Sequence, residues 1–534
     1  MQQREVFDYL IVGAGSAGTP LAARLSEDPQ TTVLLLEAGP DFTSAETPEA
    51  MRALNPQAIQ DAATYPQYHW PGLRARRSPA QEPLPYLRGR GVGGSSANNG
   101  LVAIRGLPED FDAWAALGGD GWSWAEVLPF FNKLEDDLEF GAAPYHGEHG
   151  PIPLDRTPPA QWGAVDAAVR EAALDLGYGW AADANDPASS GVSPFAFTGR
   201  AGRRVSTNDA YLEPARGRPN LTILGDTHVD RVLFSGERAI GVRAHRASAW
   251  REFHAREVVL AAGAIHSPAI LQRSGVGPAP LLRSLGISSV RDLPVGEGLI
   301  DHPIAWINPQ LRPEFRAGPN DVRHEDCCVR YSSGLAGAGR NDMIILCTNF
   351  TGGDERGRTM AFIGVSAFQT FSRGWTRITT TDPFQDPEVE LRMLTDERDR
   401  VRLRDGIRRL FAIGQHPAVT RIAARVTLAG TDDGAMTDLA DDAALDAWLD
   451  RVVFDTYHPA GSCRMGATND PHAVVDSACR VHDLAGLRVV DAAIMPTIPR
   501  ANLHLTCVMI GERMAAHIRK EWAAWQEIGG AVER

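Results

Sequence analysis

Short apolar runs open this chain and are separated by polar or glycine-rich stretches. Residues 7–12 form one run and residues 33–36 form a second, and each has the length and composition of a buried strand. The stretch between them is predicted to be a helix. Strands that alternate with helices indicate an α/β fold built on a parallel sheet.

The middle of the chain repeats this pattern and then changes. Four further strands are predicted at residues 221–224, 229–234, 240–242 and 258–260. A helix is expected at residues 267–274, because Pro268 suits a first helical turn. Beyond residue 300 we expect three strands and one charged amphipathic helix, at 343–347, 360–368, 375–381 and 399–411.

The turn after the first predicted strand carries a glycine fingerprint. Gly13, Gly15 and Gly18 follow a G-x-G-x-x-G frame, and Glu37 ends the second strand. Glycines at this spacing let the backbone approach a pyrophosphate, and an acid at this position reaches a ribose hydroxyl. The pattern therefore predicts a bound dinucleotide, without saying which one.

These elements predict a Rossmann-like nucleotide-binding domain interrupted by a second domain with a mainly antiparallel sheet, in a chain that is α/β at its start and α+β overall. The first domain is predicted to comprise residues 1–155, 205–300 and 451–534. The second is predicted to comprise residues 156–204 and 301–450. A chain of 534 residues is too long for one ordinary core, which agrees with this division.

Two irregular stretches follow the fingerprint. Residues 40–86 are rich in Pro, Gln and Arg, and we interpret them as a long excursion that covers the nucleotide as a lid. Residues 89–100 contain many glycines, whose backbone amides can press against a ligand. A flexible linker is the alternative for this loop, but Arg88, Arg90 and the pair Asn98-Asn99 favour ligand binding.

Charge and apolar content exclude several classes of protein. The net charge is −14, whereas a nucleic-acid-binding surface needs a basic face. No apolar run reaches the roughly 18 residues of a membrane span. The first predicted strand begins at Phe7, which leaves no room for a signal peptide. We expect a protein that has no membrane span and binds no nucleic acid.

The thiols and imidazoles show no metal-binding arrangement. The six cysteines contain no C-x-x-C pair, so reduced thiols in the cytoplasm are expected. His472, Cys479 and His482 come nearest to a ligand set, but no fourth ligand has a suitable spacing. A metal is therefore not expected.

Two histidines of the C-terminal region are candidates for proton transfer. His458 lies in a turn rich in Pro and Gly, and His504 directly precedes an apolar helix predicted at residues 506–518. Imidazole exchanges protons near neutral pH, and a helix N-terminus favours a developing negative charge. Structural or surface roles are the alternatives for both side chains.

Four blocks of the sequence resemble the glucose–methanol–choline (GMC) oxidoreductases, a family of FAD-dependent alcohol oxidases and dehydrogenases. The blocks are Gly13 to Gly18 with Glu37, Gly89 to Gly100 with Arg105-Gly106, Gly263 to Gly277, and His458 to Gly461 with Asp491 to His504. They extend from the fingerprint to the last predicted helix. The resemblance implies that the dinucleotide is FAD.

The resemblance also implies which residues meet FAD. The fingerprint would approach the pyrophosphate, Glu37 would hold the ribose, and the loop 89–100 would run beside the isoalloxazine. The residues implied are Gly13, Gly15, Gly18, Glu37, Arg90, Gly93, Gly94, Ser95, Asn98, Asn99, Val229, Asp491 and Ala492. Asn98 stands where some members tether the flavin through a histidine, so noncovalent FAD is expected.

For catalysis the resemblance implies His458 together with a His or Asn partner, and His504 matches this partner. His458 would take the proton of an alcohol, and His504 would hold its oxygen. The chain departs from many relatives by having Leu505-Thr506 where a proline often follows. This departure puts the start of the last helix in question.

Residues 105–108 and 144–147 resemble bacterial members that oxidise primary aryl or furanic alcohols to aldehydes. Thr456, Phe368 and Trp306 are candidate substrate contacts, and O2 (giving H2O2) or a quinone-type compound is the expected electron acceptor. A dehydrogenase for a sugar, polyol or pyridoxine-like alcohol is the alternative. Of two non-redox alternatives, an α/β hydrolase lacks its G-x-S-x-G elbow, and a nucleotide-binding regulatory protein leaves the histidine pair unexplained.

Overall fold

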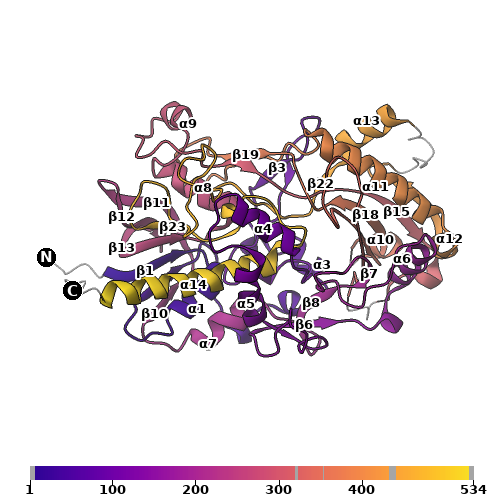
Figure 1. The fold of residues 1–534 in the computed structure, drawn as a ribbon, viewed down its shortest axis with the longest axis horizontal. Helices are drawn as coiled ribbons and strands as arrows, with labels where there is room; N and C mark the ends of the chain where they lie inside the picture. Colours follow the sequence, from indigo (N-terminus) through magenta and orange to yellow (C-terminus); the bar gives the residue numbers. More distant parts are fainter. Residues whose placement is uncertain (1–5, 319–322, 353, 432–440, 528–534) are drawn as a thin grey trace.

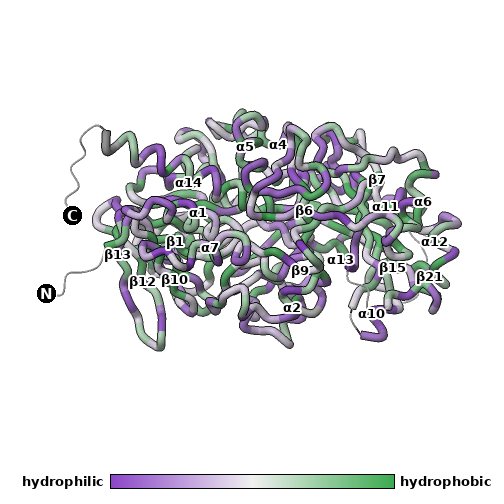
Figure 2. Tube along the Cα trace, turned by 90° about the horizontal axis from the view of Figure 1, so that it is seen from below, coloured by the Kyte–Doolittle hydropathy of each residue, from purple (hydrophilic) through white to green (hydrophobic). Residues whose placement is uncertain are grey.

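The computed structural model describes residues 6–318, 323–352, 354–431 and 441–527. Two seven-stranded sheets lie toward opposite ends of an elongated molecule (Figure 1). Hydrophobic segments run through the interior of the trace, and hydrophilic segments lie mostly along its outside (Figure 2). Within the described ranges, no helix combines the length and apolar character that crossing a bilayer requires.

The first sheet confirms the predicted nucleotide-binding fold. Its strands are β1 (Val6–Val12), β2 (Val33–Leu36), β10 (Leu221–Leu224), β11 (Thr227–Ser235), β12 (Arg238–Arg246), β13 (Ala249–Leu260) and β23 (Leu487–Val489). Val12 lies in parallel register with Leu36 and Leu260, so the carboxyl ends of β1, β2 and β13 meet at one edge. The apolar residues 10–12, 33–36 and 258–260 at these ends are buried, as in a parallel sheet covered on both faces. At the start of the chain, α1 (Gly18–Leu25) packs against the C-terminal α14 (Leu503–Glu527).

The second sheet is antiparallel, as predicted. In spatial order it contains β21 (Ala423–Leu428), β15 (Pro303–Leu311), β18 (Phe362–Ala367), β17 (Met343–Thr348), β16 (Cys327–Tyr331) and β7 (Gly191–Pro194), with β22 (Phe454–Asp455) beside β15. Three helices pack on it or on one another, namely α6 (Ala164–Asp175), α11 (Glu397–Gln415) and α12 (Pro417–Ile422). The opposite face of β15 is left to line a cavity.

Two smaller sheets join parts of the chain that were predicted to lie in different domains. One contains β14 (Glu297–Leu299), β19 (Gly374–Arg377), β20 (Glu388–Glu390), β3 (Arg74–Arg76) and β4 (Leu84–Pro85). The other contains β5 (Glu135–Asp137), β6 (Ile152–Arg156), β8 (Ala196–Arg200) and β9 (Arg203–Arg204). The domain limits stay a prediction, and their outer ends at residues 1 and 534 lie outside the described residues.

Helix α8 (Gly263–Arg273) begins earlier than predicted, so Pro268 lies inside it. A proline has no N–H to donate, which leaves the carbonyl of Ala264 without its helical partner. The hydroxyl of Ser462 donates to this carbonyl at 2.6 Å. Helix α8 is therefore tied to the turn that carries His458.

Helix α14 also begins before its predicted first residue, at Leu503. The helices not yet named are α2 (Glu49–Arg52), α3 (Gln57–Gln60), α4 (Pro108–Ala116), α5 (Trp124–Leu134), α7 (Glu213–Ala215), α9 (Ala279–Ser284), α10 (Glu355–Thr359) and α13 (Asp442–Val452). Of these, α5 packs against both α4 and α14.

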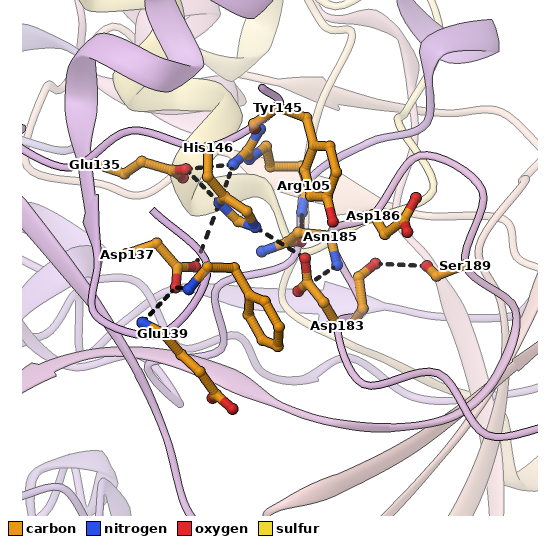
Figure 3. A network of polar contacts seen from close by, with 12 residues as sticks. Arg105, Glu135, Asp137, Glu139, Tyr145, His146, Asp183, Asn185, Asp186 and Ser189 are labelled. Carbon is orange, nitrogen blue, oxygen red and sulfur yellow. Dashed lines mark hydrogen bonds and ion pairs between the residues drawn. The ribbon is translucent and has the colours of Figure 1, made fainter. Parts of the chain in front are cut away.

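A buried network of charged side chains connects residues 105 to 183 (Figure 3). The imidazole of His146 lies 2.6 Å from Glu135 and 2.9 Å from Asp183. Burial alone would lower the pKa of His146, but hydrogen bonds to Asp183 and Glu135 raise it above its usual value. The other charged members of the network are Arg105, Asp137 and Arg156. The His146 ring and two guanidinium groups thus lie among three carboxylates inside the fold.

Candidate active site

A cavity of about 1450 Å³ lies between the two large sheets in the described part of the chain. Its wall includes the carboxyl ends of β1 and β2 on one side and the exposed face of β15 on the other. Gln57, Gln60, His69 and Trp70 also line it. The segment 40–86 therefore forms part of the wall, and its movement as a lid stays a prediction.

Glycines bring the turn after β1 against the loop 89–100. Gly94 has a φ of +50°, and a Cβ there would lie 2.7 Å from the Cα of Gly15. Gly13 has a φ of +104°, and a Cβ there would lie 2.5 Å from the carbonyl oxygen of Ala261. Only glycine fits both positions. The backbone at Gly13, Gly15 and Gly94 consequently lines the cavity itself.

Three residues that the resemblance assigned to FAD contact lie behind this wall, namely Gly18, Arg90 and Gly93. A Cβ on Gly18 would lie 2.0 Å from the carbonyl oxygen of Gly13, so glycine permits a close start of α1. The N–H of Gly93 donates to Ala14 at 2.8 Å, and Arg90 donates to the carbonyl of Ala38 at 2.9 Å. These residues shape the wall without lining it.

Three helices begin at the cavity. Ala17 precedes α1, Gly263 begins α8 and Leu503 begins α14, and all three residues line the space. A helix N-terminus presents unpaired N–H groups and the positive end of the helix dipole. Three such ends around one cavity suit a ligand with negatively charged phosphates.

The carboxylate of Glu37 holds three backbone segments together at the cavity. It accepts hydrogen bonds from the N–H groups of Ala14 at 2.9 Å, Gly39 at 2.8 Å and Gly91 at 2.9 Å. Burial raises the pKa of Glu37, and these hydrogen bonds act against that rise. Glu37 lines the cavity as well, so it both holds the wall together and borders the space inside it.

Asp491 plays a similar part at the start of α8. Its carboxylate accepts hydrogen bonds from the N–H of Gly263 at 2.8 Å and the hydroxyl of Ser267 at 2.6 Å. Burial raises the pKa of Asp491. The other predicted FAD contacts that line the cavity are Ser95, Asn98, Asn99, Val229 and Ala492.

The turn that carries His458 is fixed by hydrogen bonds to its backbone. Tyr457 has a φ of +62°, a strained value for a non-glycine residue. Asp455 accepts a hydrogen bond from the N–H of Tyr457 at 2.9 Å, and Asp301 accepts from the N–H of His458 at 2.9 Å. Arg88 donates to the carbonyl of Tyr457 at 2.8 Å. These contacts hold the His458 side chain in one place.

The ring of His458 has partners on both nitrogens. Nδ1 lies 2.7 Å from the hydroxyl of Thr456 and 3.0 Å from Nδ1 of His302. Nε2 lies 3.3 Å from Nδ2 of Asn502. Burial, then His302 and Arg88, lower the pKa of His458 well below its usual value. The imidazole is therefore neutral near pH 7 and can accept a proton.

His458 and His504 both line the cavity, but no hydrogen bond joins them in the described part of the chain, and their action as a catalytic pair stays a prediction. Nδ1 of His504 lies 3.2 Å from the hydroxyl of Ser16, and burial lowers the pKa of His504 to about 4. Asn502 stands at His458 instead. Successive helical residues turn by about 100°, so two side chains two positions apart at the start of α14 point in different directions.

Two residues beside His458, Asn502 and His302, were not predicted from the sequence. Asn502 directly precedes α14. Asparagine is common as a helix cap at this position, so the residue type alone does not indicate a catalytic role. His302 directly precedes β15, 156 residues before His458. No short motif links such distant positions, and only the folded sheet brings them together.

The three candidate substrate contacts all line the cavity. Phe368 stacks on His302 with ring centroids 4.4 Å apart, and Thr456 contacts Nδ1 of His458 directly. Trp306 packs beside Phe362. Along β15 the lining side chains run from Ile304 and Trp306 to Asn308 and Gln310. The lining side chains of β15 thus change from apolar to polar along the strand.

The comparison with known families agrees with this arrangement. Two models described as GMC oxidoreductase match residues 7–304 and 370–511. The chain belongs to the GMC oxidoreductase family. It is an FAD-dependent oxidoreductase that acts on CH–OH groups of alcohols. The glycine backbone, the three helix starts and Glu37 fit FAD in the cavity.

Individual relatives differ in what their names say. The 5-(hydroxymethyl)furfural oxidase of Methylovorus sp. (strain MP688) is 37% identical over 96% of this chain and 98% of its own length. The oxygen-dependent choline dehydrogenase of Cronobacter sakazakii is 37% identical over 96% of this chain and 95% of its own. The crystal structure of pyridoxine 4-oxidase from Mesorbium loti superposes with a TM-score of 0.86, at 32% identity over 96% and 99% of the two chains.

The two stretches that suggested aryl or furanic alcohols lie outside the cavity wall. Arg105 and His146 meet in the buried charge network of Figure 3, where both contact Glu135. Neither residue lines the cavity. Arg105 and His146 therefore belong to the folded core and not to the substrate site. The substrate is inferred from the residues that line the cavity.

Proposed function

We propose that this GMC oxidoreductase oxidises a primary aryl or furanic alcohol to the aldehyde and passes the electrons to O2, giving H2O2. The observation that carries the proposal is the neutral Nε2 of His458, which faces Asn502 at the apolar end of the cavity. FAD, when bound, supplies the hydride acceptor and the route for two electrons to O2 or to another acceptor such as a quinone.

The protein's own residues supply proton transfer and orientation. His458 Nε2 takes the hydroxyl proton of the alcohol, a general-base role usually worth about 10²- to 10⁴-fold in rate. The Asn502 amide donates a hydrogen bond to the alcohol oxygen and keeps it beside Nε2. Phe368, Ile304 and Ile344 present an apolar wall that keeps water from this end of the cavity.

The FAD is proposed to be noncovalent. Asn98 lines the cavity, and its amide lies 3.3 Å from Nδ1 of His69 and 3.5 Å from the carbonyl of Tyr68. An amide cannot form the bond that a tethering histidine forms. His69 lies close by, but its Nε2 is 2.6 Å from the carbonyl of Ile59, which engages that nitrogen.

Asn502→Ala is expected to slow reduction of the flavin by alcohol about 10- to 10²-fold, while His504→Ala is expected to slow it less than about fivefold. The reason is that Asn502 contacts His458 and His504 contacts Ser16. Anaerobic stopped-flow mixing measures this step without the electron acceptor. A larger loss of the reduction rate in His504→Ala than in Asn502→Ala would show that His504, and not Asn502, is the catalytic partner of His458.

A panel of alcohols tests the substrate class. 5-Hydroxymethylfurfural and 4-methoxybenzyl alcohol are expected to reduce the flavin at least about tenfold faster than glucose, sorbitol, choline or pyridoxine, because the wall beside His458 is apolar. Each alcohol is assayed in parallel with O2 and with a quinone. Faster reduction by a sugar, polyol or pyridoxine, with turnover supported only by the quinone, would favour the alternative dehydrogenase.

A further inference from the structure

His302 is a buried histidine whose ring touches His458 but not the cavity. Its side chain has no exposed surface, and it is absent from the cavity wall. One face of the ring stacks on Phe368, with the two planes 18° apart. The edge of the ring meets His458 at an interplanar angle of 84°. A residue in this place can act on a substrate only through His458.

The contact between the two rings requires a definite arrangement of hydrogens. Nδ1 of His302 and Nδ1 of His458 lie 3.0 Å apart, and exactly one hydrogen fits between two neutral imidazole nitrogens. Nε2 of His458 faces the amide nitrogen of Asn502 at 3.3 Å, a donor that calls for a lone pair on Nε2. The ring hydrogen of His458 therefore belongs on Nδ1.

His302 is suited to accept that hydrogen bond. Burial lowers the pKa of His302 to about 3, so its ring is neutral across the physiological range. The carbonyl groups of Phe368 and Pro499 act on the same ring and oppose part of this shift. Nε2 of His302 has no hydrogen-bond partner among the described residues, so the hydrogen between the two rings is assigned from the contact of His458 Nε2 with Asn502.

The carboxylates near His458 accept hydrogen bonds from groups other than its ring. Asp301 accepts from the backbone N–H of His458 and from the hydroxyl of Tyr86 at 2.6 Å. Asp455 accepts from Arg77 at 2.6 Å and from the N–H of Tyr457. Among the described residues, the acceptors that reach Nδ1 of His458 are thus the nitrogen of His302 and the hydroxyl of Thr456.

We propose that His302 is a positioning residue that accepts the Nδ1–H of His458 and so keeps the lone pair of His458 on Nε2, where the alcohol proton is taken. The proposal rests on the function proposed above. A neutral imidazole here does what a carboxylate does in a Ser-His-Asp triad, since it selects the tautomer and stabilises the imidazolium once the proton has arrived. Thr456 assists as a second acceptor on the same hydrogen.

Paired variants test the acceptor. His302→Phe keeps a ring on Phe368 but removes the acceptor, whereas His302→Asn retains an oxygen near the position of Nδ1. Flavin reduction by 5-hydroxymethylfurfural is expected to slow about 10²-fold in His302→Phe and less than about tenfold in His302→Asn. The alcohol concentration giving half the maximal reduction rate, the flavin content and the melting temperature are expected to stay close to wild type in both. Equal losses in the two variants, or no loss in His302→Phe, would overturn the proposal.

Thr456→Val provides a test that does not depend on the folding of His302→Phe. With His302 in place, removing the Thr456 hydroxyl is expected to slow reduction less than about fivefold. A 10²-fold loss in Thr456→Val alone would make Thr456 the acceptor and refute the assignment to His302. His458→Ala distinguishes a failure of this proposal from a failure of the proposed function. An unchanged rate of flavin reduction in His458→Ala would refute the proposed function itself.

Discussion

His458→Ala is expected to retain FAD and its fold while reduction of the flavin by alcohol slows at least about 10²-fold. The side chain is fixed by backbone hydrogen bonds that an alanine at this position keeps, including the one to Asp301. What the variant loses is the neutral Nε2 that faces Asn502. Anaerobic stopped-flow absorbance near 450 nm measures this step directly.

The double variant His458→Ala/Asn502→Ala shows whether the two side chains act together on one proton or contribute independently to the rate. We expect it to be little slower than His458→Ala, because groups that act on one proton are not additive. Additive losses would mean that Asn502 contributes independently of the base. Reduction at a near wild-type rate in His458→Ala would remove His458 from catalysis.

Glu37→Ala is expected to lose most of its FAD and to show a lower melting temperature. The substitution leaves the N–H groups of Ala14, Gly39 and Gly91 without their acceptor, and each unsatisfied buried group costs roughly 1–3 kcal/mol. Occupancy is measured from the FAD that trichloroacetic acid releases into the supernatant. Flavin that stays in the acid pellet would contradict noncovalent binding.

Glu37→Gln is the matched control for this prediction. A glutamine keeps the size of the side chain but offers one acceptor oxygen, so intermediate occupancy is expected. Turnover per bound flavin should remain within about threefold of wild type in both variants, since Glu37 and His458 share no hydrogen bond in the described part of the chain. Full occupancy with lost turnover would place Glu37 in the chemistry instead.

The nucleotide-binding fold could be predicted because its signals are local. A buried strand such as β2 is a continuous apolar run, and Gly13 follows β1 directly. Boundaries were less predictable, since Pro268 marks an early position in many helices but lies inside α8. There the missing helical hydrogen bond is replaced by Ser462, which is distant in sequence.

The site was predicted only in part, because side-chain direction is not a local signal. His504 lines the cavity, but its Nδ1 lies beside Ser16, whereas Asn502 contacts His458. His302 is joined to His458 only through the antiparallel sheet of β15 and β22. Arg105 and His146 carried a family resemblance that the comparisons confirm, but they lie in a buried charge network and not in the cavity wall.

The hydrogen bond from Ser462 to Ala264 joins the two halves of the site thermodynamically. The N-terminus of helix α8 lines the cavity, and the turn bearing His458 is attached to the same helix through the carbonyl that Pro268 leaves without a helical partner. The free energy by which FAD binding stabilises the folded state therefore stabilises that turn as well. FAD binding at the start of α8 is thus expected to disfavour local opening of the turn that bears His458.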